Sequence, residues 1–162
     1  MIDQSLADML CQRIEGALRS APHQPLVVGI CGAQGSGKST LTDHLAQRLA
    51  QGGLRVAALS LDDLYKTRNE RQGMAQAVHP LFATRGVPGT HDVALGLETI
   101  AALRRGEPAP LPRFDKAVDD RAPREGWPLA PAGTQVLLLE GWCVGARPQA
   151  DVSVPVNALE AQ

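Results

Sequence analysis

GAQGSGKS, residues 32–39, sets the architecture of this chain, because it satisfies the phosphate-loop pattern G-x-x-x-x-G-K-[ST] at every position. The apolar run LVVGIC at 26–31 precedes it, and leucines at 41, 45 and 49 follow it at helical spacing. A strand, a glycine-rich turn and a helix in this order direct backbone N–H groups and the positive helix end at phosphate oxygens. The segment therefore predicts a nucleoside triphosphate site with these binding residues: Gly32, Ala33, Gln34, Gly35, Ser36, Gly37, Lys38, Ser39 and Thr40.

Two side chains of this loop have distinct predicted roles. Lys38 is expected to reach the β- and γ-phosphates, and the Ser39 hydroxyl is expected to ligate Mg²⁺. The alternative is a flexible connector rich in glycine and serine. A connector needs neither an apolar strand before it, nor a helix after it, nor a lysine between them, so phosphate binding is the favoured interpretation.

Composition indicates one folded domain. The 162 residues are 44% hydrophobic, and a formal net charge of -1 gives no bulk attraction to nucleic acid or anionic lipid. The N-terminus lacks a basic leader, and no apolar stretch approaches the roughly 18 residues of a membrane span. Three cysteines at unrelated spacings, Cys11, Cys31 and Cys143, indicate a reduced setting and small buried hydrophobes rather than ligands. We therefore expect a cytoplasmic protein with no nucleic-acid or membrane partner.

Hydrophobic periodicity divides the chain into alternating helices and strands. The continuous apolar run at 26–31 is typical of a strand buried on both faces. The predicted elements are helices over 3–19, 38–51 and 93–105, and strands over 26–31, 54–60 and 134–139. We expect an α/β fold with a parallel sheet and helices on both sides, which is the three-layer α/β/α architecture of P-loop NTPases.

A proline-rich segment interrupts this alternation. Six prolines fall between residues 107 and 131, so neither a long helix nor a central strand is expected there. Loops longer than about 12–15 residues within compact domains are often functional. We therefore expect residues 113–124 to face a substrate.

Carboxylates follow two of the predicted strands. Asp62 and Asp63 come directly after 54–60, and Glu140 comes directly after 134–139. The carboxyl ends of parallel strands share one edge, so these acids are expected beside the phosphates. One of the aspartates can serve as general base, and Glu140 can hold Mg²⁺ directly or through water. The alternatives are an Asp-Asp turn or helix cap, and a glutamate that simply emerges into solvent.

Cationic and aromatic groups complete the candidate site. Arg113, Lys116 and Arg121 lie in the proline-rich segment and could bind an acceptor carboxylate or neutralise charge on the transferred phosphoryl group. For any single arginine, solvation of the surface is an equally good explanation. Tyr65 and the pair His91-Asp92 are further acceptor-side candidates, although helix capping also explains Asp92. The two tryptophans are expected to pack rather than to stack on a base.

Five ordered segments together resemble the plant-type D-glycerate 3-kinase group of the phosphoribulokinase, uridine kinase and pantothenate kinase superfamily. They are residues 32–40, SLDDLY at 60–65, GTHD at 89–92, PRFDK with DR at 112–121, and LEGW at 139–142. Such an ordered set is far more specific than a phosphate loop alone. The resemblance spans 25–147 and implies one kinase domain over 1–162, with a leading helix in 1–24 and a tail at 148–162.

The resemblance also implies roles for individual residues. The predicted catalytic residues are Asp62, Lys38 and Glu140, and the predicted metal ligands are Ser39, Asp62 and Glu140. The predicted acceptor-binding residues are Asp63, Tyr65, His91, Asp92, Arg113, Lys116 and Arg121. The implied reaction uses ATP and Mg²⁺ and transfers the γ-phosphoryl group to a hydroxyl of a small hydroxy acid, with D-glycerate favoured and Asp62 as base.

Members of that group continue past the point that matches Asn157, with more parallel strands and an arginine-bearing lid. We therefore expect a fold that is incomplete at its C-terminal end, with 26–31 as an open edge strand. The alternatives left open are a nucleoside or pantothenate kinase of the same superfamily and an ATP-binding protein without turnover. A GTPase switch and a transporter-type ATPase are disfavoured, because N-K-x-D, D-x-x-G and L-S-G-G-Q do not occur.

Overall fold

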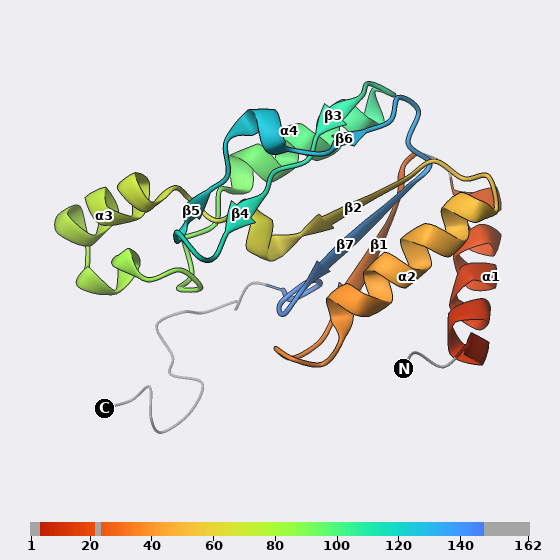
Figure 1. Cartoon of the computed structure of the whole chain (residues 1–162), viewed down its shortest axis with the longest axis horizontal. Coiled ribbons are helices and arrows are strands. Elements are labelled where there is room, and N and C mark those ends of the chain that lie inside the picture. Colours follow the sequence, from red (N-terminus) through yellow and green to blue (C-terminus); the bar gives the residue numbers. More distant parts are fainter. Residues whose placement is uncertain (1–3, 22–23, 148–162) are drawn as a thin grey trace.

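A three-stranded parallel sheet organises the chain (Figure 1). The computed structural model describes residues 4–21 and 24–147, so the predicted tail at 148–162 lies outside the described residues. Strands β1 (Leu26–Cys31), β2 (Val56–Ser60) and β7 (Val136–Gly141) stand in the order β1-β7-β2. β7 pairs with both neighbours in parallel, and the carboxyl ends of all three strands therefore meet at one edge.

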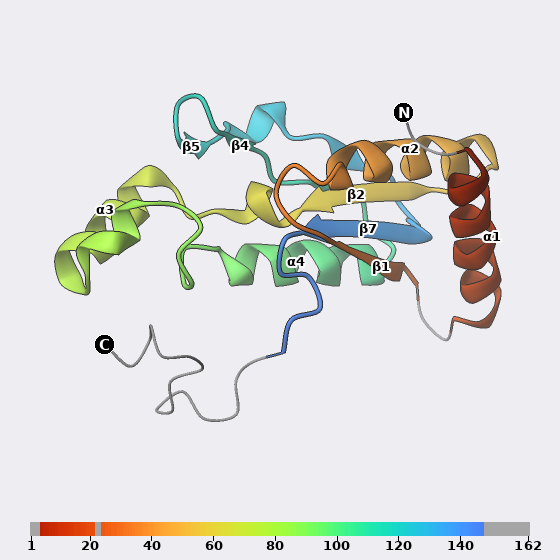
Figure 2. The same ribbon diagram turned by 90° about the horizontal axis from the view of Figure 1, so that it is seen from below.

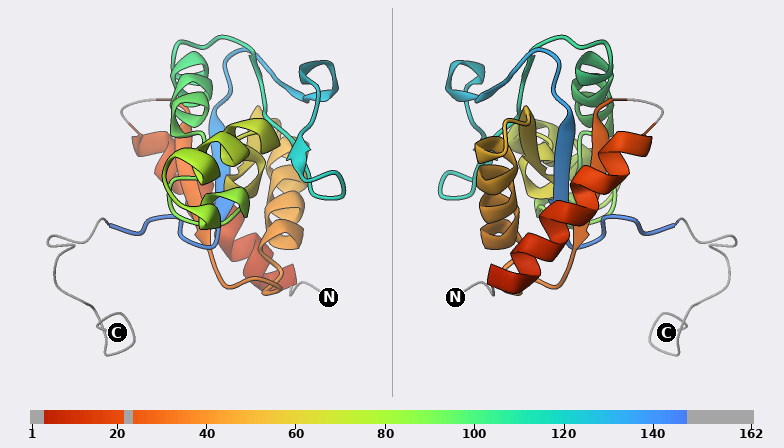
Figure 3. Two further views of the ribbon diagram at one scale, coloured as in Figure 1. Left: turned by 90° about the vertical axis from the view of Figure 1, so that its left-hand side faces the viewer. Right: turned by 90° about the vertical axis from the view of Figure 1, so that its right-hand side faces the viewer.

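Helices cover both faces of the sheet, which confirms the predicted three-layer architecture (Figure 2). The helices α1 (Gln4–Ser20) and α2 (Lys38–Gln51) pack with Val136 and Leu138 of β7, whereas α4 (Val93–Arg104) packs with Leu137. Side chains alternate along a strand, so consecutive residues of β7 serve opposite layers. All three side chains are fully buried, and each burial contributes about 1.5–3 kcal/mol. The two end-on views place β7 between α2 and α4 (Figure 3).

β1 is less buried than its apolar sequence predicts. Its side chains facing α1 and α2 are half-buried, but Val27, Gly29 and Cys31 on the other face are exposed. The prediction of burial on both faces is therefore wrong, and so is the burial expected of Cys31, whereas Cys11 is buried and Cys143 half-buried. The reason is that β1 is an edge strand, as predicted, and the α4 layer packs on β2 and β7.

One helix has no counterpart in the sequence predictions. It is α3 (Arg68–Ala77), which is followed by the short 3-10 helix η2 (Pro80–Ala83) beyond the carboxyl edge of the sheet (Figure 1). Thr67 and Glu70 form a capping box at its start, with the Thr67 N–H donating to the Glu70 carboxylate at 2.8 Å. The Thr-x-x-Glu spacing that starts α3 can be recognised in the sequence. Hydrophobic periodicity does not predict this helix, because α3 has few apolar residues.

The proline-rich segment contains only short ladders, in agreement with the prediction. β3 (Ala109–Pro110) pairs with β6 (Leu129–Ala130), and β4 (Phe114–Asp115) pairs with β5 (Asp120–Arg121). A further 3-10 turn, η3, spans Arg124–Gly126. The β4–β5 turn carries residues 116–119 toward the carboxyl edge of the sheet, where they can contribute to a site.

A fully buried arginine ties these outer segments together. The Arg71 guanidinium donates to the carbonyls of Lys66 (3.2 Å), Ala83 (2.8 Å) and Asp119 (2.7 Å), and it pairs with the Asp119 carboxylate at 2.9 Å. It also lies over the Phe114 ring, 5.7 Å from the centroid. A buried arginine is tolerated only when its donors are satisfied. Arg71 therefore fixes α3, the end of η2 and the β4–β5 turn relative to one another.

Replacing Arg71 by methionine is expected to destabilise the fold by about 3 kcal/mol, because three carbonyls lose a charged donor in a buried setting. Urea unfolding followed by circular dichroism measures this loss. Arg68→Met is the matched control, because Arg68 starts the same helix and is exposed. The control is expected to change stability by less than about 0.5 kcal/mol. Equal stability of the two variants would contradict the role given to Arg71.

Candidate active site

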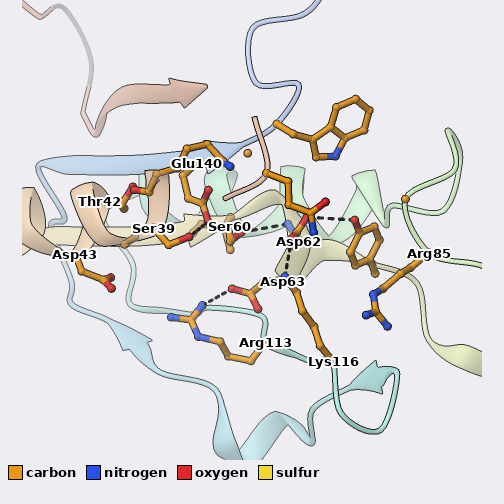
Figure 4. A pocket seen from close by; sticks show the side chains of 18 of the residues that line it. Ser39, Thr42, Asp43, Ser60, Asp62, Asp63, Arg85, Arg113, Lys116 and Glu140 are labelled. Atoms are coloured by element: carbon orange, nitrogen blue, oxygen red, sulfur yellow. Dashed lines mark hydrogen bonds and ion pairs between the residues drawn. The ribbon is translucent and has the colours of Figure 1, made fainter. Parts of the chain in front are cut away.

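A cavity of about 750 Å³ opens at the carboxyl edge of the sheet (Figure 4). Segments far apart in the sequence line it: the phosphate loop with the start of α2, the residues after β2, the proline-rich segment and the end of β7. The predicted residues that border it are Gln34, Gly35, Lys38, Ser39, Asp62, Asp63, Tyr65, Arg113, Lys116 and Glu140. The structure therefore brings all three predicted metal ligands, four of the nine predicted nucleotide residues and four of the seven predicted acceptor residues into one space.

The phosphate loop has a backbone suited to an anion. Gly37 has a φ of 84° and caps α2 without any side-chain hydrogen bond, so the first amides of α2 remain available to an anionic ligand. A Cβ atom at Gly32 would lie 2.9 Å from Ser36 Oγ and 3.2 Å from Lys38 Cγ, so any larger residue there would require these side chains to shift. Lys38 Nζ donates to the Ala33 carbonyl at 2.9 Å across the loop.

Two predicted metal ligands meet directly. Ser39 Oγ donates to Glu140 Oε1 at 3.1 Å, and Glu140 is only 8% exposed. Oxygen donors of this kind suit Mg²⁺, which is commonly held by one or two protein groups together with phosphates and water. No cluster of three or more histidine, cysteine or acidic side chains exists among the described residues, so a cage made by protein alone is not found there. The pair fits a metal ion that is shared with a nucleotide.

Asp62 presents its carboxylate from the 3-10 helix η1 (Leu61–Leu64), directly after β2. Its Oδ1 accepts from the Tyr65 hydroxyl at 3.1 Å and its Oδ2 from Lys116 Nζ at 2.7 Å. Burial acts to raise the pKa of Asp62, but Lys116 and the Tyr65 hydroxyl outweigh burial and hold that pKa below its usual value. Burial, and then Asp62, raises the pKa of Tyr65 to about 12. Asp62 is therefore ionised at neutral pH, and Tyr65 remains a hydrogen-bond donor.

Asp63 connects η1 to the proline-rich segment. Its Oδ1 accepts from the Phe114 N–H at 3.0 Å, and its Oδ2 accepts from Arg113 Nη1 at 3.2 Å. Burial raises the pKa of Asp63 more than the Phe114 hydrogen bond and the Arg113 charge lower it. In this structure Asp63 holds β4 against the site, and its binding to an acceptor stays a prediction.

Three other predicted acceptor residues lie behind Tyr65 rather than on the cavity wall. Asp92 caps α4 by accepting from the Leu95 N–H at 3.0 Å, and it pairs with Arg121 Nη2 at 2.8 Å. Arg121 Nη2 also donates to the Tyr65 carbonyl at 2.9 Å. The His91 ring stacks on Tyr65 with centroids 4.5 Å apart, and burial lowers the pKa of His91. The three side chains hold Tyr65 in place, and their direct contact with an acceptor stays a prediction.

Several residues that border the cavity were not assigned from the sequence, among them Thr42, Asp43 and Trp142, and Arg85 borders it too. Thr42 lies one helical turn after Lys38 and donates to its carbonyl at 2.9 Å, so helical spacing could have found it. Arg85 pairs with Asp119 in a contact that no local pattern indicates. The packing predicted for Trp142 is wrong, because its side chain is 48% exposed beside the cavity.

None of the helices in the described part of the chain combines the length and the hydropathy needed to cross a bilayer.

One protein-family model matches part of the chain. It is described as methylmalonyl Co-A mutase-associated GTPase MeaB, and it matches residues 4–68. The matched region includes the phosphate loop, β2 and Asp62. It stops before the proline-rich segment and β7, and therefore contains neither Lys116 nor Glu140. The similarity to that GTPase family is limited to the nucleotide-binding half of the site.

Curated relatives match a larger share of the chain. An uncharacterized kinase of Schizosaccharomyces pombe is 36% identical over 144 residues, which cover 83% of this chain and 52% of that protein. The chloroplastic D-glycerate 3-kinase of Arabidopsis thaliana is 35% identical over 150 residues, which cover 85% of this chain and 32% of that protein. A uridine kinase of Leuconostoc citreum is 30% identical over 118 residues, 73% of this chain and 53% of that protein. The chain thus spans about half or less of the length of each of these relatives.

Comparison of the fold with solved structures also finds a D-glycerate 3-kinase. The solved structure of D-glycerate 3-kinase from Cryptococcus neoformans superposes with a TM-score of 0.79 at 31% identity, and the match covers 91% of this chain and 56% of that one. By sequence and by fold, this chain therefore belongs to the P-loop kinases, in the family that includes D-glycerate 3-kinases and uridine kinases.

Proposed function

We propose that this protein is an ATP-dependent kinase that transfers the γ-phosphoryl group to a hydroxyl of a small hydroxy acid, with D-glycerate as the favoured acceptor. The observation that carries this proposal is the shared cavity, in which an ionised Asp62 and the phosphate-loop lysine Lys38 face one space. The similarity to D-glycerate 3-kinases supports the choice of acceptor.

The proposed reaction is an in-line displacement. Loop amides and Lys38 hold the β- and γ-phosphates, while Asp62 accepts the proton of the acceptor hydroxyl as its oxygen attacks the γ-phosphorus and ADP leaves. Ser39 and Glu140, with Asp62 nearby, would hold Mg²⁺, and this ion would supply positive charge to the phosphate oxygens. Glu140 is kept in place for this task by its hydrogen bond from Ser39.

A nucleoside kinase is the second candidate, because a uridine kinase is also among the relatives at 30% identity. The two candidates differ in the charge of the acceptor. Arg113 and Lys116 both border the cavity and offer positive charge that uridine does not need and a hydroxy acid does. This charge favours an acidic acceptor.

The test is a coupled assay of ADP release with Mg²⁺-ATP and D-glycerate, uridine or pantothenate as acceptor. We expect D-glycerate to increase ADP release well above the rate without acceptor, and 3-phosphoglycerate to be identified by mass spectrometry. Uridine-dependent ADP release without any D-glycerate-dependent release would favour the nucleoside kinase. If calorimetry showed ATP binding but none of the acceptors stimulated ADP release, the chain would be an ATP-binding protein without turnover.

A further inference from the structure

Both oxygens of the proposed base are already in use. Asp62 Oδ1 accepts from Tyr65, and Asp62 Oδ2 accepts from Lys116 Nζ at 2.7 Å, the shorter of the two contacts (Figure 4). Each carboxylate oxygen can accept a second hydrogen bond, but Lys116 borders the same cavity as Asp62, so an acceptor hydroxyl that approaches Oδ2 from the cavity competes with the ammonium there. Tyr65 is only 5% exposed and is stacked on His91, so it is fixed in place. Of the two contacts, the one with Lys116 is therefore the contact that an incoming acceptor can displace.

The Lys116 side chain is exposed and only weakly held. It stands on the β4–β5 turn and its side chain is 57% exposed, while the Asp62 side chain is 35% exposed. An ion pair at this level of exposure is weak, because water and salt screen both charges. A lysine side chain also has a flexible four-carbon stem, and its ammonium is a compact charge that can pair with an anion from many directions. Lys116 can thus leave Asp62 at low cost when another anionic group comes within its reach.

The other cations around the cavity have different partners. Arg113 Nη1 is held by the Pro112 carbonyl at 2.9 Å and by Asp63. Arg85 is paired with Asp119, and Lys38 belongs to the phosphate loop. Among the cations that border the cavity in the described part of the chain, Lys116 is the one whose ion-pair partner is the proposed base itself.

We propose that Lys116 masks Asp62 until an acceptor arrives, and that the carboxylate of the acceptor takes Lys116 away and so frees Asp62 Oδ2 for the acceptor hydroxyl. This inference rests on the proposed function and makes Lys116 a specificity-determining residue. The acceptor class it selects is small hydroxy acids, because a neutral alcohol offers the ammonium no anionic partner in exchange for the base. No net charge changes in this exchange, because the ion pair between Lys116 and Asp62 is replaced by an ion pair between Lys116 and the acceptor carboxylate.

The exchange differs from simple attraction between Lys116 and an acid. If Lys116 only attracted the acceptor, its removal would weaken the binding of acids and leave neutral analogues unchanged. Under the exchange, a neutral analogue must compete with Lys116 for Asp62, so removal of Lys116 helps the neutral analogue. Opposite changes for acidic and neutral acceptors are therefore the signature of masking.

The experiment compares D-glycerate with its neutral amide, D-glyceramide, in the wild-type chain and in Lys116→Gln. Calorimetry gives dissociation constants in the presence of Mg²⁺ and a non-hydrolysable ATP analogue, and again without the nucleotide. We expect the wild-type chain to bind D-glycerate about tenfold more tightly than the amide. In Lys116→Gln we expect D-glycerate to bind about tenfold more weakly and the amide to bind about twofold to fivefold more tightly.

The matched control is Lys66→Gln, which makes the same chemical change at a lysine that does not border the cavity. It is expected to leave both dissociation constants unchanged. Unaltered or weaker amide binding in Lys116→Gln would overturn the masking of Asp62. Equal affinity of the nucleotide-loaded wild-type chain for acid and amide would overturn it too, because the phosphates rather than the acceptor would then hold Lys116. Failure of the wild-type chain to bind D-glycerate at all contradicts the proposed function itself, whereas binding without discrimination contradicts only the exchange.

Discussion

Asp62→Asn is expected to lower kcat for D-glycerate phosphorylation by about 10²-fold to 10⁴-fold, because an amide cannot take up the proton of the attacking hydroxyl. The substitution keeps the shape of the side chain and leaves an oxygen that can still accept from Tyr65. We therefore expect the fold and the affinity for ATP to remain close to those of the wild-type chain. Steady-state kinetics measure the fall in kcat, and calorimetry measures ATP binding.

The control for this variant is Asp8→Asn, which makes the same change at a half-buried aspartate of α1 that pairs with Arg48 of α2 and does not border the cavity. It should leave kcat unchanged. A loss of less than about tenfold in Asp62→Asn would show that Asp62 is not the base, since positioning by the remaining groups would then account for the rate. Loss of ATP affinity in Asp62→Asn would instead indicate that this carboxylate acts mainly on the metal side.

Lys38→Met is expected to weaken ATP binding by at least about 100-fold and to reduce kcat below detection. The ammonium is the positive charge of the phosphate loop, and its loss leaves the β- and γ-phosphates without a partner there. Methionine retains most of the aliphatic stem that packs close to Gly32, so the loop is expected to keep its shape. Calorimetry with ATP and Mg²⁺ measures the affinity, and thermal unfolding checks that the variant is folded.

Lys66→Met is the matched control for Lys38→Met, because it removes a lysine that does not border the cavity. ATP affinity should then stay at the wild-type level. If Lys38→Met bound ATP as tightly as the wild-type chain, the phosphate-loop assignment would be wrong, and with it the basis for the kinase proposal.

Local sequence patterns predicted the elements that build the nucleotide half of the site. The helix expected at 38–51 is α2 with the same bounds, and the strand expected at 26–31 is β1. These predictions succeed because the signals are local: a run of apolar residues, a glycine turn and leucines at helical spacing. The acids at 62, 63 and 140 were expected near the phosphates because parallel strands end at one edge, and all three border the cavity.

Other features depend on contacts between distant residues, which periodicity cannot indicate. β7, the last strand in the described part of the chain, lies between β1 and β2, and this order leaves one face of β1 exposed. The burial of Arg71 follows from three segments that fold around it, although an arginine in a polar helix is expected to be exposed.

The amino-acid sequence by itself determined that this chain has a P-loop pattern between a strand and a helix of a parallel sheet, because loop, strand and helix signals are each complete within a few residues. Tertiary structure alone decided how the acidic and basic groups pair. Asp62 and Lys116 are 54 residues apart and meet only because the β4–β5 turn lies over the end of β2. Charge pairing depends on distance in space, and the folding of the proline-rich segment sets that distance.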